Sequence, residues 1–263
     1  MNNLLEINNL SVDFPSRRGQ VAAVNKVSIS VAKGEVLGLV GESGAGKSTV
    51  GNSVINLLEP PGYISGGEII FDGTRIDQMS NEEMRKIRGA KIGTIFQDPQ
   101  TSLNPLMTIG KQLSETLIET LKISGSSALQ KSIELLDSVG IPNPDQRLNA
   151  YPHQFSGGMR QRVVIALALA GDPDLVIADE PTTALDVSIQ KQILDLIKSL
   201  CKQRNLGVII VTHDIGVIAE IADRVAVMYN GQLVEEGKVR QVLQKPKHDY
   251  TKSLISAVPS GDQ

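Results

Sequence analysis

Residues 36–49 read VLGLVGESGAGKST, an apolar run that leads directly into a glycine-rich loop. A short apolar run that ends in glycine is typical of a buried strand, and the apolar spacing over 49–58 predicts a helix stopped by prolines at 60–61. The loop matches the pattern G-x-x-x-x-G-K-[ST] through Gly41, Gly46, Lys47 and Ser48. The stretch therefore predicts a strand, a phosphate-binding loop and a helix in that order.

The loop has the residue types that phosphate binding requires. Glycine N–H groups can surround phosphate oxygens, Lys47 brings a positive charge to the outer phosphates, and Ser48 offers a hydroxyl to Mg²⁺. A simple tight turn is the alternative, and the position between a strand and a helix argues against it. The residues expected to contact phosphate are Gly41, Glu42, Ser43, Gly44, Ala45, Gly46, Lys47, Ser48 and Thr49.

Further apolar runs indicate the fold class. Runs rich in Val and Ile recur between helical segments, at 92–96, 175–178, 208–211 and 225–228. Such runs predict a largely parallel sheet covered by helices. Alternating segments at 4–9 and 27–31, and an Asn230-Gly231 turn between two strand-like runs, add an antiparallel portion. We expect an α/β fold.

One region interrupts the alternation of strands and helices. Turn residues and two amphipathic stretches, at 109–121 and 129–139, follow residue 97. We therefore expect a helical subdomain over 98–158. The nucleotide-binding core is expected over 1–97 and 159–240, with a polar surface tail at 241–263.

Polar side chains follow several predicted strands. Asp179 and Glu180 end the run LVIADEP, while Gln97 and His213 follow two other strands. Because the carboxyl ends of parallel strands meet at one edge of a sheet, we expect these residues near the phosphate loop. Asp179 would hold Mg²⁺ through water, Glu180 would orient or deprotonate the attacking water, and His213 would contact the γ-phosphate. A helix N-cap is the alternative for Glu180, and an ordinary satisfied polar residue is the alternative for Gln97 and His213.

A second glycine pair lies before another predicted helix. In SGGMRQR, Ser156, Gly157 and Gly158 lead into a helix over 159–170 and offer a second anion site at its N-terminus. One ATP has one γ-phosphate, and the first loop already occupies one side of it. The second turn is therefore expected to serve a nucleotide held by another copy.

Composition excludes several classes of protein. The formal net charge of −3 gives no electrostatic footprint for nucleic acid. The single Cys201 falls on the apolar face of a predicted helix, so burial is expected and a disulfide within the chain is impossible. The beginning MNNLLEINNL is unlike a signal peptide, and the longest apolar run, VVIALALA, is too short to span a membrane.

Taken in order, the motifs resemble those of an ABC-transporter ATPase subunit over nearly the whole chain. They are GESGAGKST, Gln97, SGGMRQR, LVIADEP, Ala184-Leu185-Asp186 and VTHD at 211–214. The resemblance implies a RecA-like P-loop core in which two subunits sandwich two ATP molecules, with the phosphate loop of one facing the SGG of the other. It also implies catalysis by Glu180, His213 and Gln97, metal binding by Ser48, Gln97 and Asp179, contacts in trans by Ser156, Gly157, Gly158 and Gln161, and signalling between sites through Asp186.

A narrower resemblance rests on IFQDPQTSLNPLMTIG, YPHQFSGGMRQR, ADEPTTALDVSIQ and KHDYTKSLISAVP. These stretches resemble the branch that powers uptake of dipeptides, oligopeptides, nickel or related solutes. Many members of that branch have proline where Asp249 stands, and many carry a tail cysteine cluster. No cysteine follows Cys201, so we expect no iron–sulfur cluster.

The resemblance also implies partners and a location. The helical subdomain and Gln97 would dock against a membrane permease, supplied with solute by an external binding protein. The second cassette would be an identical copy, a sister subunit or the other half of a fused chain. Such a protein would sit at the cytoplasmic face of the inner membrane.

The adenine contact is a departure from the family. Relatives often stack adenine on an aromatic side chain upstream of the phosphate loop, whereas SRRGQVAAV has none. Arg18 could stack its guanidinium on the base, with Phe14 as the second candidate and a plain exposed arginine as the alternative.

Other nucleotide-binding proteins fit less well. NKVS at 25–28 lacks the Asp of the guanine-reading motif Asn-Lys-x-Asp, and the segment between Gln97 and Ser156 is too short for the coiled-coil arm of DNA-repair members. A non-enzymatic scaffold would lack Glu180. We expect an ATPase that hydrolyses MgATP and drives a separate permease for peptide import. Import of nickel or another small solute is the alternative, and a non-transport ABC ATPase is the third hypothesis.

Overall fold

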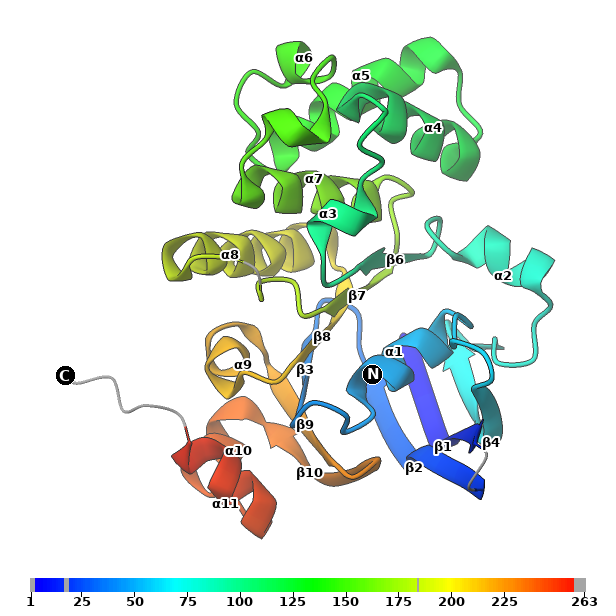
Figure 1. The fold of residues 1–263 in the computed structure, drawn as a ribbon, viewed down its shortest axis with the longest axis vertical. Helices are drawn as coiled ribbons and strands as arrows, with labels where there is room; N and C mark the ends of the chain where they lie inside the picture. The colour runs from blue at the N-terminus through cyan, green and yellow to red at the C-terminus, as the bar shows by residue number, and fades with distance from the viewer. Residues whose placement is uncertain (1–2, 17–18, 184, 258–263) are drawn as a thin grey trace. The chain divides into compact units, whose positions relative to one another are not determined.

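The computed structural model describes residues 3–16, 19–183 and 185–257 (Figure 1). The chain divides into two compact units, each described by itself below. The first unit comprises Met1–Met84 and Gly207–Gln263, and the second comprises Arg85–Leu206. The helix α2 (Asn81–Ile87) carries the chain from the first unit into the second.

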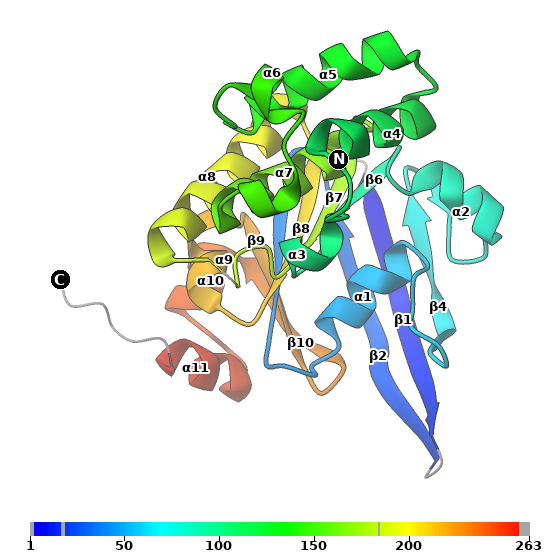
Figure 2. The ribbon, with the colours of Figure 1, turned by 45° about the horizontal axis from the view of Figure 1, so that its top comes forward.

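An antiparallel sheet in the first unit has the strand order β2-β1-β4-β5 (Figure 2). Its strands are β1 (Leu5–Ser16), β2 (Gly19–Val31), β4 (Tyr63–Phe71) and β5 (Thr74–Arg75). β4 is missing from the sequence prediction. Its residues Gly66 and Gly67 oppose an irregularity in β1, and the middle of the strand reads Ser65-Gly66-Gly67-Glu68, which lacks the apolar residues that would have marked a strand.

A parallel sheet of the first unit is built around the predicted apolar run. β3 (Val36–Val40) pairs in parallel with β8 (Gly207–Thr212) and with β9 (Arg224–Tyr229). Every residue of β3 and β8 is buried, as expected for parallel strands covered on both faces. The predicted hairpin is present: Asn230 and Gly231 have φ of 48° and 75° and join β9 to the antiparallel β10 (Gln232–Lys238).

The helix after the phosphate loop is shorter than predicted. α1 spans Lys47–Val54, whereas apolar spacing predicted a helix over 49–58. Asn56 adopts a left-handed conformation with φ 50°, and Leu57 N–H donates to the Asn52 carbonyl at 2.9 Å. This Schellman-type ending stops the helix before the prolines are reached.

The C-terminal part of the first unit is helical. It contains α9 (Ile215–Ile221), α10 (Val239–Gln244) and α11 (Asp249–Ser256). The segment expected as a surface tail therefore includes the structured helix α11, in which Thr251 is fully buried. Cys201, on a helix of the second unit, is buried as expected.

The second unit has two parallel strands, β6 (Ile92–Ile95) and β7 (Leu175–Asp179). Its helices are α3 (Pro99–Ser102), α4 (Ile109–Leu121), α5 (Gly125–Ser138), α6 (Pro144–Arg147), the 3-10 helix Pro152–Gln154, α7 (Gly157–Leu169) and α8 (Val187–Arg204). α4 and α5 pack together through apolar faces that include Leu113, Leu117 and Leu136. Every helix in the described part of the chain is too short or too polar to cross a lipid bilayer.

Candidate functional site

The phosphate loop, residues 41–49, is ordered around its lysine. Lys47 Nζ donates hydrogen bonds to the carbonyl oxygens of Gly41 at 2.7 Å and Glu42 at 2.8 Å. The side chain is only 5% exposed, while the neighbouring Ser48 is exposed. A buried ammonium must be compensated by hydrogen bonds, and the loop supplies them from its own backbone. The loop therefore encloses a fixed positive charge and presents a hydroxyl beside it.

Gly46 sets the geometry of the turn into α1. It is the N-cap of the helix with φ 94°, a left-handed conformation that favours glycine, and a Cβ there would collide with the Ala23 carbonyl oxygen. No side chain caps this helix end. A helix N-terminus without a side-chain cap is suited to an anion, which the helix dipole also favours.

His213 lies at the same sheet edge as the phosphate loop, within the first unit. Val40 pairs with Thr212, so the residues that follow β3 and β8 leave the sheet side by side. His213 is exposed, and the next residue, Asp214, caps α9 by accepting a hydrogen bond from Gly216 N–H at 2.7 Å. The predicted convergence of these two motifs on one edge is therefore present.

Gln97, Asp179 and Glu180 come together in the second unit. β6 and β7 are in parallel register, with Ile95 opposite Ala178, so both strands end at the same edge. Gln97 Nε2 donates to Glu180 Oε2 at 3.0 Å. Thr183, which the sequence analysis did not single out, donates its hydroxyl to the same oxygen at 2.7 Å.

Glu180 also has an unusual backbone. Its φ of 45° places a non-glycine residue in the left-handed region, a conformation that costs energy and concentrates at functional sites. Two donors to its carboxylate and this backbone turn together fix where the side chain lies. Such a fixed carboxylate can orient a water molecule or accept its proton.

Each unit carries oxygen ligands of the kind that Mg²⁺ prefers beside waters and phosphate oxygens. Ser48 offers a hydroxyl and Asp179 a carboxylate. Because the Gln97 amide nitrogen faces Glu180, its Oε1 is the atom suited to a cation. Among the described residues, no three His, Cys, Asp or Glu side chains gather into a metal site of their own.

The signature turn, residues 156–158, is the start of α7 in the second unit. Ser156 Oγ accepts a hydrogen bond from Met159 N–H at 3.3 Å and caps the helix. Gly158 packs closely on the first turn of α8, since a Cβ there would lie 2.7 Å from Ile189 Cγ2. α8 begins directly after the exposed Asp186, so the structure brings the signature turn close to the Asp186 loop.

The remaining predicted contacts are Gln161, Arg18 and Phe14. Gln161 is 1% exposed, so its side chain lies inside the second unit while Ser156 is exposed. Arg18 lies outside the described residues. The ring of Phe14 is half-buried and covers the backbone of Gly62, where an added Cβ would lie 2.5 Å from it.

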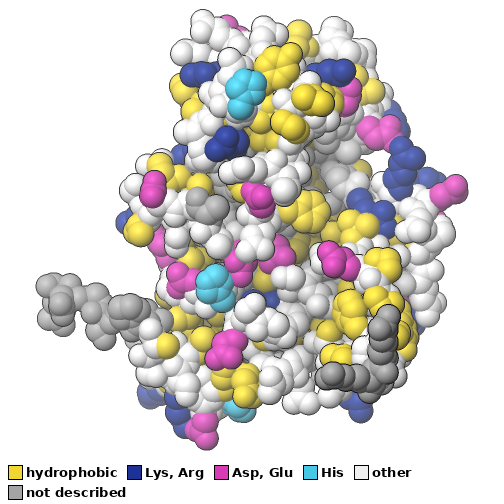
Figure 3. All heavy atoms as spheres, in the orientation of Figure 1, with side chains coloured by type: hydrophobic (Ala, Val, Ile, Leu, Met, Phe, Trp, Pro, Cys, Tyr) yellow, Lys and Arg dark blue, Asp and Glu magenta, His cyan; other side chains and the backbone are white. Residues whose placement is uncertain are grey.

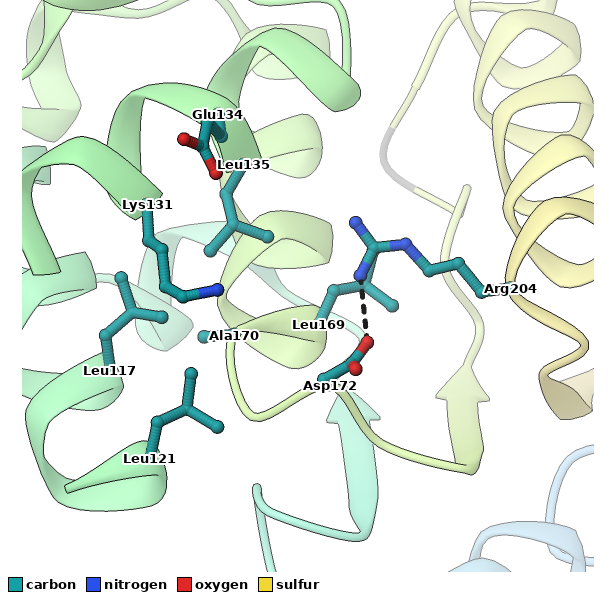
Figure 4. Close-up of a pocket in the computed structure, with 9 residues that line it drawn as sticks. All are labelled: Leu117, Leu121, Lys131, Glu134, Leu135, Leu169, Ala170, Asp172 and Arg204. Atoms are coloured by element: carbon teal, nitrogen blue, oxygen red, sulfur yellow. Dashed lines mark hydrogen bonds and ion pairs between the residues drawn. The ribbon is translucent and has the colours of Figure 1, made fainter. Parts of the chain in front are cut away.

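A pocket of about 270 Å³ lies elsewhere in the second unit (Figure 4). It has a leucine-lined wall from α4 and α5 and a charged rim. Arg204 and Asp172 form an ion pair at 3.5 Å there, and Lys131 and Glu134 project from α5. None of the predicted site residues lines this pocket, so it is separate from the phosphate chemistry.

Comparison with known proteins assigns a family to these motifs. A family model described as ABC transporter matches residues 24–183. An oligopeptide transport ATP-binding protein, OppD of Bacillus subtilis, is 52% identical over 98% of this chain and 72% of its own length. The dipeptide transport ATP-binding protein DppD of the same organism is 49% identical over the whole chain and 78% of its own length.

Solved structures give the same result for the fold. MJ0796, described as a bacterial ABC transporter cassette and solved as a dimer, superposes with a TM-score of 0.78 at 32% identity, covering 90% of this chain and 99% of that one. A post-hydrolysis dimer of the same cassette, bound to ADP and phosphate, also has a TM-score of 0.78, at 31% identity with the same coverage. The predicted P-loop α/β fold is therefore confirmed.

Proposed function

The chain belongs to the ABC transporter family, as an ATP-hydrolysing subunit, and from this premise we propose that it powers peptide import through a separate membrane permease. The observation that carries the solute assignment is the 52% identity, over 98% of the chain, to an oligopeptide transport ATP-binding protein. The dipeptide relative at 49% supports the same solute class. Nickel or another small solute is the alternative within this branch.

The first unit would bind the phosphates of ATP. Residues 41–49 form the loop around the phosphates and supply backbone N–H groups other than that of Glu42, which donates to Tyr250. Lys47 supplies the charge, and exposed His213 at the same edge would contact the γ-phosphate. Lys47 is held at two carbonyl oxygens by the loop itself. A preorganised cation of this kind loses little side-chain freedom on binding.

The second unit would supply the hydrolytic residues. Glu180 would orient the attacking water and accept its proton, held in position by Gln97 and Thr183. Ser48, Asp179 and Gln97 would hold Mg²⁺, which when bound neutralises charge on the phosphate oxygens.

Two cassettes would form the ATP sandwich. MJ0796, a relative in fold at 32% identity, is a dimer, and we propose that two copies of this chain pair in the same way. The exposed Ser156, with Gly157 and Gly158, would then face the nucleotide of the partner. Gln161, being buried, would support the turn from inside, and Asp186 would link the two sites.

The second unit would also meet the permease. Exposed apolar side chains in this unit include Phe96 next to Gln97, and Leu106, which is 86% exposed. Apolar groups are visible over the helical elements in the space-filling view (Figure 3). Contiguous exposed apolar surface marks protein interaction sites, and we propose that these side chains belong to the permease contact. The chain would thereby sit peripherally at the cytoplasmic face of the cell membrane.

Reconstitution tests the proposal directly. The chain is incorporated into proteoliposomes with candidate permease subunits and a solute-binding protein, and ATP hydrolysis is measured with and without peptides or Ni²⁺. We expect peptides to stimulate hydrolysis, and Lys47→Ala complexes to remain inactive. Stimulation by Ni²⁺ alone would overturn the peptide assignment, and absence of any hydrolysis would overturn the ATPase mechanism.

A further inference from the structure

The C-terminal helix of the first unit folds back onto the phosphate loop. Tyr250, in α11, accepts a hydrogen bond at its hydroxyl oxygen from Glu42 N–H at 2.8 Å, although the two residues are 208 positions apart. The Tyr250 ring stacks on Tyr229 at the end of β9, with centroids 4.2 Å apart and planes 28° apart. Two independent contacts therefore tie α11 to the nucleotide-binding edge of this unit.

The hydrogen bond acts on a single peptide group. Glu42 N–H and the Gly41 carbonyl belong to the same peptide, and that carbonyl accepts the bond from Lys47 Nζ at 2.7 Å. A trans peptide is planar, and its N–H and C=O point in opposite directions. The plane is thus held by Tyr250 on one side and by Lys47 on the other. Rotation of the plane would move the carbonyl that orients the lysine ammonium.

α11 is itself held in place by hydrogen bonds, which fix the position of Tyr250. The Glu235 carboxylate of β10 accepts hydrogen bonds from Lys247 N–H at 2.9 Å and His248 N–H at 3.0 Å. His248 Nδ1 in turn accepts from Tyr250 N–H at 3.2 Å and caps the helix. Burial raises the pKa of the Tyr250 hydroxyl above 10.0, against the opposing effect of the Glu42 N–H bond, so the hydroxyl is neutral at physiological pH.

We propose that Tyr250 is a positioning residue for ATP binding, which acts through the peptide linking Gly41 to Glu42 to hold Lys47 and the phosphate loop ready for the phosphates. The inference rests on the proposed function, because it names what orders that same loop. A loop that is already ordered loses less conformational freedom when the ligand binds. The C-terminal helix therefore contributes to affinity without touching the nucleotide.

Tyr250→Phe tests the inference, because it keeps the stacked ring and removes only the hydroxyl. We expect the Kd for a fluorescent ATP analogue and the KM for ATP to rise by about two- to tenfold, the effect of one hydrogen bond. The kcat should change little and the thermal midpoint should stay near that of the wild type, because the ring packing is kept. A general loss of stability would not raise the KM while leaving the kcat unchanged.

Tyr229→Phe is the matched control. It removes a hydroxyl from the other ring of the stack, and no hydrogen bond of that hydroxyl is present among those of the described residues. Its Kd should equal that of the wild type. A second variant, Glu235→Gln, weakens the anchor of α11 without altering Tyr250 and should raise the Kd by a smaller factor.

The outcomes separate this inference from the proposed function. An unchanged Kd in Tyr250→Phe, or an equal rise in Tyr229→Phe, overturns the role of Tyr250. Failure of the wild-type chain to bind the analogue would instead overturn the proposed function itself.

Discussion

The two glycine-rich turns of this chain both lead into a helix, yet they are built differently. In the phosphate loop, the helix cap is a left-handed glycine without a side-chain bond, and a buried lysine lies under the turn. In the signature turn, the cap is an exposed serine whose hydroxyl already accepts an N–H of its own helix.

This difference separates two tasks. The phosphate loop combines a helix N-terminus that has no side-chain cap with a fixed cation, so it is suited to bind phosphate alone. The signature turn uses one of its donors internally and offers little charge. It is suited to complete a site around a phosphate that another cassette already holds.

The largest expected effect comes from a residue that belongs to neither turn. Glu180→Gln should leave ATP binding intact and lower the hydrolysis rate by roughly 100- to 10,000-fold, since a general base is lost while the hydrogen-bonding shape is kept. Single-turnover hydrolysis and analogue binding measure the two effects, with Glu134→Gln on α5 as the control. Hydrolysis near the wild-type rate would remove Glu180 as the base.

Removing the lysine of the phosphate loop should weaken ATP binding itself. Lys47→Ala should weaken ATP affinity by about 10- to 150-fold, the value of a charge-assisted hydrogen bond. Equilibrium titration with the analogue measures it, and Lys202→Ala, on the last turn of α8, is the control. Full affinity in Lys47→Ala would contradict the assignment of the phosphate loop.

A negative charge placed at the signature turn should leave ATP binding unchanged but slow ATP hydrolysis. Ser156→Asp retains a good N-cap, so α7 should remain folded, but its carboxylate would repel a phosphate presented by a partner. We expect hydrolysis to fall by about tenfold or more, with the ATP affinity of the single cassette unchanged. Ser124→Asp, at the equivalent cap of α5, is the control. A parallel loss of ATP affinity would mean that the two turns share one nucleotide within one chain.

The smallest expected effect is a change in the order of the phosphate loop with pH. Burial opposes the ionisation of Glu235, but hydrogen bonds from His248 and Lys247 N–H outweigh it and lower the pKa below 4.5. The stability that this carboxylate gives α11 is therefore complete above about pH 4.5 and is lost as the pH falls through the folded-state pKa. Protection of the backbone amides over 41–48 against hydrogen exchange, corrected for the slower intrinsic exchange in acid, should fall as acid releases α11, while protection over 156–160 should not. An equal loss of protection in both turns, or unchanged protection of 41–48 in Glu235→Gln relative to wild type at neutral pH, would overturn the role of α11.

Local patterns were enough to predict the elements that carry nucleotide chemistry. The strand over 36–40 and the helix over 109–121 match β3 and α4, because a fully apolar run and an amphipathic repeat are visible in short windows. The motif residues could also be assigned to strand ends. Parallel register then explains why His213 lies beside the phosphate loop and Gln97 beside Glu180.

The elements that depend on distant partners could not be predicted in this way. α11 is held by the carboxylate of Glu235 on β10 and by the ring of Tyr229 on β9. These contacts with distant residues cannot be recognised from the local sequence of the tail. The end of α1 depends on a left-handed Asn56, where apolar spacing alone favoured continuation. Thr183 and Tyr250 escaped notice for the same reason, since their roles arise from contacts with Glu180 and Glu42.

We propose that each turn acts on a different copy of the chain, and mixing two variants distinguishes this arrangement from action within one copy. Lys47→Ala and Ser156→Asp are purified separately, combined in equal amounts, and assayed for ATP hydrolysis. We expect the mixture to hydrolyse ATP faster than the average of the two variants assayed alone, because one intact phosphate loop then faces one intact signature turn. A mixture no more active than the average of its two components would contradict the pairing of the two turns between copies of this chain.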